Sequence, residues 1–133
     1  MAPAGFTQHQ SAFSAKDTAG RLEATLKAKG LTLFARVDHA AGAAAVDLRL
    51  RPTEVFIFGN ARGGTPLMQA QQTAGIDLPL KALIWEDADG KVWLGYNEPV
   101  WIAERHGLGA EVGQTVTALS AALAGLAKAA TEG

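Results

Sequence analysis

Two short segments joined by a glycine-containing turn constrain the fold of this chain more than any other feature. Leu80–Glu86 and Lys91–Tyr96 have the composition and length of β-strands. The residues between them, Asp87–Gly90, end in a glycine that can adopt the positive φ angle of a short hairpin loop. This stretch therefore predicts an antiparallel hairpin, and the other elements are placed around it.

Three other segments predict further strands. Leu31–Val37 alternates, with Leu31, Leu33, Ala35 and Val37 on one face and Thr32, Phe34 and Arg36 on the other. Thr53–Phe58 is β-branched and aromatic on both faces, which is typical of a central strand covered on both sides. Phe6–Phe13 alternates weakly and suits an edge strand. A sheet of four to five strands follows.

Helix signals separate these strands. Ser14 stands three residues before Asp17, as in a capping box, and the helix that follows should end at Gly30. Thr65 is a candidate cap with Pro66 at the first helical position, which makes Gly59–Pro66 a loop. The predicted helices are the one from Ala15 to its end at Gly30, Ala40–Leu48, Leu67–Ala74, Asn97–His106 and a C-terminal amphipathic helix at about 110–131.

The C-terminal helix carries an unbroken apolar stripe. The stripe could pack on the sheet of its own chain or against a second copy of the chain, and the sequence leaves both open. Its members are Val112, Val116, Leu119, Leu123, Leu126 and Ala130.

Length and composition exclude several classes of protein. The 133 residues, 48% hydrophobic and 19% charged, fit one globular domain over residues 1–133. The 12 basic and 13 acidic residues give a net charge of −1 without a basic cluster, so we expect no nucleic-acid partner. No cysteine is available for disulfides, thiol redox chemistry or thiolate metal sites. Without a signal peptide or about 20 consecutive apolar residues, the sequence predicts a cytoplasmic protein that makes no membrane contact.

The glycine segment Gly59–Thr65 is one candidate site. It follows a predicted strand and opens a helix, as a phosphate-binding loop does, but the lysine of such a loop is missing. Pro66 also removes a backbone donor. The segment is either a turn that needs glycine for its backbone angles or a cradle for an anion, assisted by Arg62.

A second candidate is Asp38–His39 at a strand end, where a carboxylate can orient an imidazole that acts as a general base. The alternative is a local role, with Asp38 capping the next helix. His9, His39 and His106 lack metal-ligand spacing, so a site combining His39, Glu86 and His106 would depend on the fold. We predict no metal site and no cofactor, and His106 suits the negative end of a helix dipole.

Five segments in the same order resemble the bacterial and archaeal family called domain of unknown function 302, over about Phe13–Leu108. They are VDHAAGA (37–43), LRLRPTEVFIFGN (48–60), GTPLM (64–68), DLPLKALIWEDADGKVWLGYNEP (77–99) and ERHGL (104–108). The resemblance implies an α+β fold of the helix-grip type, like the TATA-box-binding protein, and a homodimer, but no reaction. Ala61 replaces the proline that usually follows the FGN triplet of the family.

The resemblance also implies a set of shared polar positions. They are Asp38, His39, Asn60, Gly64, Thr65, Glu86, Tyr96 and Asn97. Together with Arg62, we expect the strand-end groups among them to line one pocket beside the glycine segment.

Three functions are then open. The first is a homodimeric module that binds a small molecule, expected to be anionic. The second is an enzyme that uses His39 as general base with Asp38 or Glu86. The third is an assembly protein without a ligand. The catalytic residues of the second remain unassigned.

Overall fold

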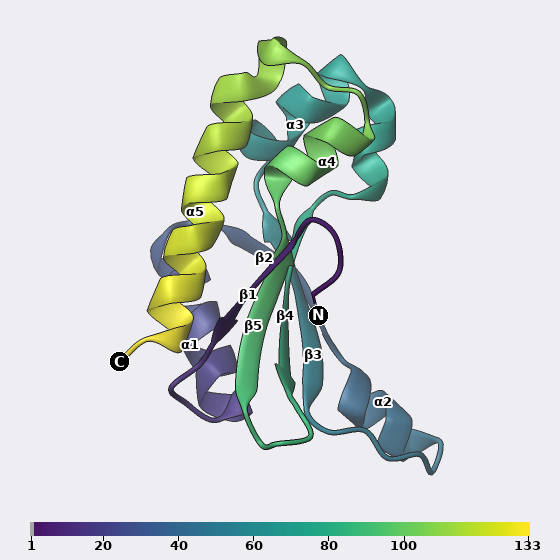
Figure 1. Ribbon diagram of the computed structural model, residues 1–133, viewed down its shortest axis with the longest axis vertical. Coiled ribbons are helices and arrows are strands. Elements are labelled where there is room, and N and C mark those ends of the chain that lie inside the picture. Colours follow the sequence, from purple (N-terminus) through teal and green to yellow (C-terminus); the bar gives the residue numbers. More distant parts are fainter. Residues whose placement is uncertain (1) are drawn as a thin grey trace.

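The computed structural model describes residues 2–133 (Figure 1). Within this range the strands form one antiparallel sheet in the order β1-β5-β4-β3-β2. The predicted α+β class is confirmed, and the sheet, predicted to have four to five strands, has five. The strands are β1 (Phe6–Gln10), β2 (Thr32–Asp38), β3 (Thr53–Gly59), β4 (Leu80–Glu86) and β5 (Val92–Asn97).

Two long helices lie on one face of the sheet, and the shorter helices lie at its two ends (Figure 1). In Figure 1, α3 and α4 are gathered at the top of the molecule, while α2 projects from the bottom. The helices are α1 (Ala15–Ala28), α2 (His39–Ala45), α3 (Ala61–Ala70), α4 (Pro99–Arg105) and α5 (Gly113–Thr131), with 3₁₀ turns η1 (Gln72–Ile76) and η2 (Ala110–Val112).

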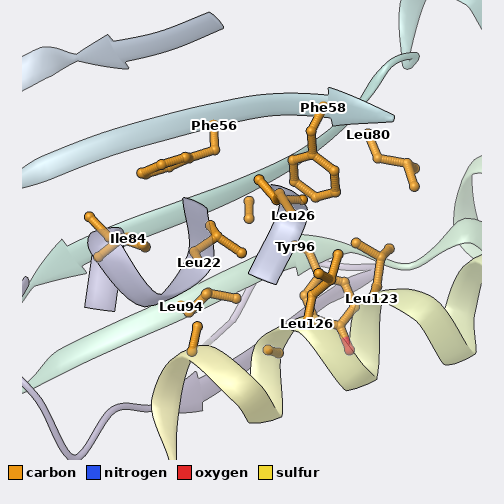
Figure 2. Close-up of a cluster of buried hydrophobic side chains, with 14 of the residues drawn as sticks. Leu22, Leu26, Phe56, Phe58, Leu80, Ile84, Leu94, Tyr96, Leu123 and Leu126 are labelled. Atoms are coloured by element: carbon orange, nitrogen blue, oxygen red, sulfur yellow. The ribbon is translucent and has the colours of Figure 1, made fainter. Parts of the chain in front are cut away.

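The core fills the space between these two helices and the inner face of the sheet. Figure 2 shows Leu22 and Leu26 of α1 and Leu123 of α5 among the aromatic and aliphatic side chains of β3, β4 and β5. Phe56 and Phe58 are 0% and 1% exposed, and burial of side chains of this size stabilises the fold by about 1.5–3 kcal/mol each. The C-terminal stripe is therefore used inside the chain, where Leu123, Leu126 and Ala130 are buried.

The outer sheet face carries the other half of each strand's side chains. We define it by the large apolar residues that point away from α1 and α5: Phe6, Val37, Val55, Ile57, Leu83, Trp85 and Trp93. β3 lies inside the sheet between β2 and β4, as predicted for a central strand, but the predicted cover on both of its faces is wrong. The middle strand is β4, and Val55 and Ile57 of β3 remain partly exposed because the long helices pack only against the opposite face.

A β-bulge interrupts the alternation of β2. Leu33 pairs with Phe58 and Ala35 with Ile57, so Phe34 is an extra residue between two paired positions. Residues opposite each other in a ladder share a face, which places Leu33 on the core side and Ala35 and Val37 on the outer side. The predicted single face for Leu33, Ala35 and Val37 is therefore corrected.

The glycine segment is helical, which corrects the predicted loop. α3 begins at Ala61, and the cap is Asn60, whose Oδ1 accepts a hydrogen bond from the Gly63 N–H at 2.7 Å. Pro66 lies inside the helix, where it gives up the one hydrogen bond that its nitrogen would donate to the Arg62 carbonyl. A side chain at Gly63 would press on Leu119 of α5, at 3.1 Å, so close packing favours glycine there.

Candidate functional site

A hollow beside the start of α3 gathers residues from three parts of the chain, and we call it the Asn60 pocket. It has a volume of about 230 Å³. Its lining is mostly apolar, with an amide and a hydroxyl as the polar groups. The lining residues are Phe34, Asn60, Ala61, Gly64, Thr65, Met68, Leu78 and Pro79.

Local structure explains how each wall is placed. The bulge in β2 takes Phe34 out of the strand alternation, and this residue, which lines the pocket, is 56% exposed. β3 ends at Gly59, whose φ of 154° favours glycine, and the chain turns there so that Asn60 can cap α3. A Cβ on Gly64 would lie 3.7 Å from Leu78 and 3.8 Å from Met68, so the missing side chain helps to keep the pocket open.

A cation stands beside the mouth of the pocket. Arg62 lines a shallow depression that shares Ala61 and Thr65 with the pocket. Among residues 2–133, Arg62 forms no ion pair, so its charge is available to a ligand. The backbone N–H groups of Ala61 and Arg62 belong to the first turn of α3, where they have no partner within the helix.

The polar residues that we expected to share this pocket lie at both ends of the sheet. β2 and β3 are antiparallel, so Thr32 pairs with Gly59 beside Asn60, while Asp38 pairs with Glu54 at the far end. Glu86 lies at that far end too, because its N–H donates to the Pro52 carbonyl. The expectation of a single pocket is therefore wrong: Asn60, Arg62, Gly64 and Thr65 come together, and Asp38, His39 and Glu86 do not join them.

Asp38 and Tyr96, which lie outside the Asn60 pocket, have structural roles. Asp38 caps α2 by accepting a hydrogen bond from the Ala41 N–H at 2.9 Å, and His39 is exposed at the first position of that helix. Tyr96 is buried in the core, with 3% of its surface exposed, and its ring stacks on that of His9 with the ring centres 6.0 Å apart. Burial raises the pKa of the Tyr96 hydroxyl, and the nearby Glu98 carboxylate adds to this effect.

A hydrogen-bonded network around His106 was missed by the sequence reasoning. Its Nε2 lies 2.6 Å from the Asp77 carboxylate and its Nδ1 2.9 Å from the Thr73 hydroxyl, while Arg105 also binds Asp77 at 2.8 Å. The network ties η1 to the end of α4. Within the described part of the chain, no group of three or more histidine, aspartate or glutamate residues could hold a metal ion.

Four residues of the Asn60 pocket were also missed, namely Phe34, Met68, Leu78 and Pro79. The last three lie within segments that carried the family resemblance, GTPLM or DLPLK, so that resemblance was the signal that could have found them. An apolar hollow with a few polar groups at its mouth is the usual form of a small-molecule site. This arrangement can hold a small apolar body and place a charged substituent near Arg62.

Comparisons with known proteins identify related chains. The family model described as "Domain of unknown function DUF302" matches residues 7–126. The crystal structure of an uncharacterized conserved DUF302 protein from Bacillus stearothermophilus superposes with a TM-score of 0.84 over 96% of this chain and 99% of that chain. The two sequences are 15% identical, so this likeness concerns the fold.

Curated relatives carry a different name. Over 105 residues the chain is 50% identical to "Fluoride-specific ion channel FluC 1" of Brucella suis biovar 1 (strain 1330) and of Brucella abortus biovar 1 (strain 9-941). The match covers 79% of this chain but only 41% and 39% of those proteins, so the chain spans about two fifths of their length. In residues 2–133, no helix has the length and apolar character needed to cross a bilayer.

Proposed function

We propose that this chain, which belongs to the family of domain of unknown function DUF302, is a small-molecule binding domain whose site is the Asn60 pocket. The observation that carries the proposal is the convergence of three family segments, around Asn60, Gly64–Met68 and Leu78–Pro79, on one hollow. The ligand has a compact apolar body and an anionic group.

The size and walls of the pocket set the apolar part of the ligand. A cavity of about 150 Å³ is large enough for benzene, so about 230 Å³ fits one ring with a substituent. Phe34 and Met68 supply an aromatic face and a polarizable thioether, and both pack well against aromatic ligands.

The polar groups at the mouth set the anionic part. Since Oδ1 of Asn60 is occupied by the Gly63 N–H, the amide NH₂ of Asn60 is the group left to donate to a ligand. The Arg62 guanidinium and the first N–H groups of α3 favour negative charge at the same place.

Benzoate is the probe that tests this arrangement. In two-dimensional NMR we expect saturable shifts of Gly64 and Met68 with benzoate, weaker effects with benzyl alcohol, and none with acetate or fluoride, because a strongly hydrated ion gains nothing from apolar walls. No saturable shift at the pocket with benzoate would contradict the proposal.

Two substitutions localise the binding. Gly64→Val fills the pocket from a helical position that has room for a side chain, so binding should be lost while the fold is kept. Gly125→Val, in α5 with nothing within 4 Å, is the matched control and should bind normally. Arg62→Met should weaken benzoate about tenfold and leave benzyl alcohol unchanged, since only benzoate carries charge.

We also propose that the domain acts as a homodimer through its outer sheet face. Apolar side chains on all five strands support this. The ring centres of Phe6 and Trp85 lie 5.9 Å apart, and those of Trp85 and Trp93 lie 6.4 Å apart. The C-terminal stripe is not the proposed interface, because it is buried within the chain.

Light scattering tests the dimer against the 13.8 kDa expected for one copy. Leu83→Glu, on the middle strand of the outer face, should produce monomers, whereas Thr117→Glu on the exposed side of α5 should not. A wild-type monomer at micromolar concentration would refute the dimer, and with it the alternative function of assembly alone.

Neither of the other two readings gains support from a specific contact. His39 lines neither the Asn60 pocket nor the larger hollow between the starts of α1 and α2, so catalysis by His39 has no substrate site.

For the Brucella channels, we propose that the segment that matches this chain is an attached binding domain rather than the pore, since the described helices here are too short or too polar to span a membrane.

A further inference from the structure

A second and larger hollow opens at the Asp38 end of the sheet, and we call it the α1–α2 cleft. It has a volume of about 470 Å³ and lies between the start of α1, the start of α2 and the ends of β2, β3 and β4. Its floor is apolar and includes Ala15, Ala19 and Ile84. It shares no residue with the Asn60 pocket.

Two of the four charged side chains in this cleft neutralise each other. Arg36 binds Glu54 with two parallel hydrogen bonds, Nε to Oε2 at 2.8 Å and Nη2 to Oε1 at 2.9 Å. The guanidinium also lies 4.5 Å from the centre of the Phe56 ring, which fixes it against the core. The Arg36 charge is thus taken up by protein carboxylates, by Glu54 in a bidentate pair and by Glu23 at 3.3 Å, and is not available to a ligand.

The other two charges, Lys16 and Asp38, remain available. Among the residues that the structure describes, neither forms an ion pair. Asp38 uses only Oδ1, which caps α2 through the Ala41 N–H, and its second carboxylate oxygen has no hydrogen bond from the described protein atoms. The cleft therefore offers one cation and one anion above an apolar floor.

We propose that the α1–α2 cleft binds a small zwitterion, a free α-amino acid with a compact aliphatic side chain. The ligand carboxylate meets Lys16, its ammonium meets Asp38, and its side chain covers Ala15, Ala19 and Ile84. A ligand with a single charge could pair with only one of these exposed groups, and the group of like sign would repel it. A zwitterion satisfies both.

Leucine and two of its derivatives separate this proposal from simple apolar binding. We expect L-leucine to shift the amide signals of Ala15, Ala19 and Ile84 saturably at up to about 10 mM, the range for a ligand of this size at modest efficiency. N-acetylleucine lacks the ammonium group and leucinamide lacks the carboxylate, and each should bind about tenfold or more weakly. Equal binding of all three, or no saturable shift with leucine, overturns the proposal.

Two charge-removing variants complete the test. Lys16→Met keeps the aliphatic stem, and Asp38→Asn keeps an equally good helix cap, so both should fold as the wild type does. Each should weaken leucine about tenfold or more, while Lys29→Met, at the other end of α1, should not. Wild-type leucine affinity in both variants, with unchanged thermal unfolding, would also overturn it. Benzoate shifts at Gly64 report the Asn60 pocket separately, so the two proposals can fail independently.

Discussion

Gly95 in β5 should resist substitution because the aromatic ring of Phe6 lies directly over it. A Cβ placed on Gly95 would be 2.1 Å from Cζ of Phe6 and 2.5 Å from its Cε2. Real carbon atoms do not approach so closely, so Gly95→Ala must push the Phe6 ring away from the sheet and from Trp85. The missing side chain of Gly95 thus leaves room for the Phe6 ring over the outer sheet face.

Two opposing terms give the magnitude. Overpacking of this kind costs about 1–3 kcal/mol. Replacing glycine by alanine in an extended strand returns about 0.5–1 kcal/mol, because alanine loses less conformational freedom on folding. The 2.1 Å contact places the cost in the upper part of its range, so we expect Gly95→Ala to lower the free energy of unfolding by about 1–2.5 kcal/mol, or to lower Tm by roughly 4–9 °C.

The double-mutant cycle with Phe6→Ala isolates the cause. With the ring removed, Gly95→Ala should no longer destabilise and should raise the free energy of unfolding by about 0.5 kcal/mol. Urea unfolding of the wild type, both single variants and the double variant, followed by circular dichroism, measures the cycle. An equal effect of Gly95→Ala with and without Phe6 would refute the reasoning.

Three further predictions rest on single contacts. Nε2 of His9 is buried without a hydrogen-bond partner in the described structure, so His9→Leu should leave the free energy of unfolding unchanged or raise it by up to about 1 kcal/mol in urea titrations. Asn60→Ala should lower it by about 1 kcal/mol through loss of the α3 cap, while Asn60→Asp should not. The Trp93 Nε1–H, and after it the Lys91 backbone N–H, hold the pKa of Asp87 below its ordinary value. The stability that this carboxylate contributes is present above about pH 4 and lost as pH falls through the folded pKa. Asp87→Asn should therefore unfold more easily than the wild type at pH 7, and the difference in free energy of unfolding between the two proteins should become smaller below about pH 4. Unfolding followed by tryptophan fluorescence measures this difference.

Local signals in the sequence were enough to place several elements. Ser14 caps α1 through the Asp17 N–H at 3.1 Å, as its spacing predicted, and Gly90 has the expected positive φ of 79° in the hairpin. These features depend on residues within one turn of each other, so no knowledge of the rest of the fold was needed.

The predicted start of α3 was wrong because two local signals for a helix start compete in this segment. Thr65 followed by Pro66 is a good helix start, but Asn60 is an equally good cap. The outcome depends on packing at long range, since helical Gly63 lets Leu119 approach closely. That contact joins residues more than fifty positions apart, and no local pattern reports it.

The grouping of site residues failed for a related reason. Asp38 ends β2 and Asn60 follows β3, but these neighbouring strands are antiparallel, so their C-terminal ends lie at opposite ends of the sheet. The sequence does not reveal which strands are neighbours, so it could not separate the two ends. The bulge at Phe34 was hidden in the same way, because an extra residue is visible only against the register of its partner strand.

The position of β1 has a consequence for biosynthesis. Its ladder partner is β5, with Phe6 opposite Asn97, and the chain just after β1 is tied to α5 by the Ala12 N–H and the Thr131 carbonyl at 2.8 Å. During translation the first strand thus emerges from the ribosome long before the segments that hold it. We expect force-sensitive arrest reporters to detect no folding until β5 has left the exit tunnel, and the nascent domain to depend until then on chaperones that shield its unpaired strands.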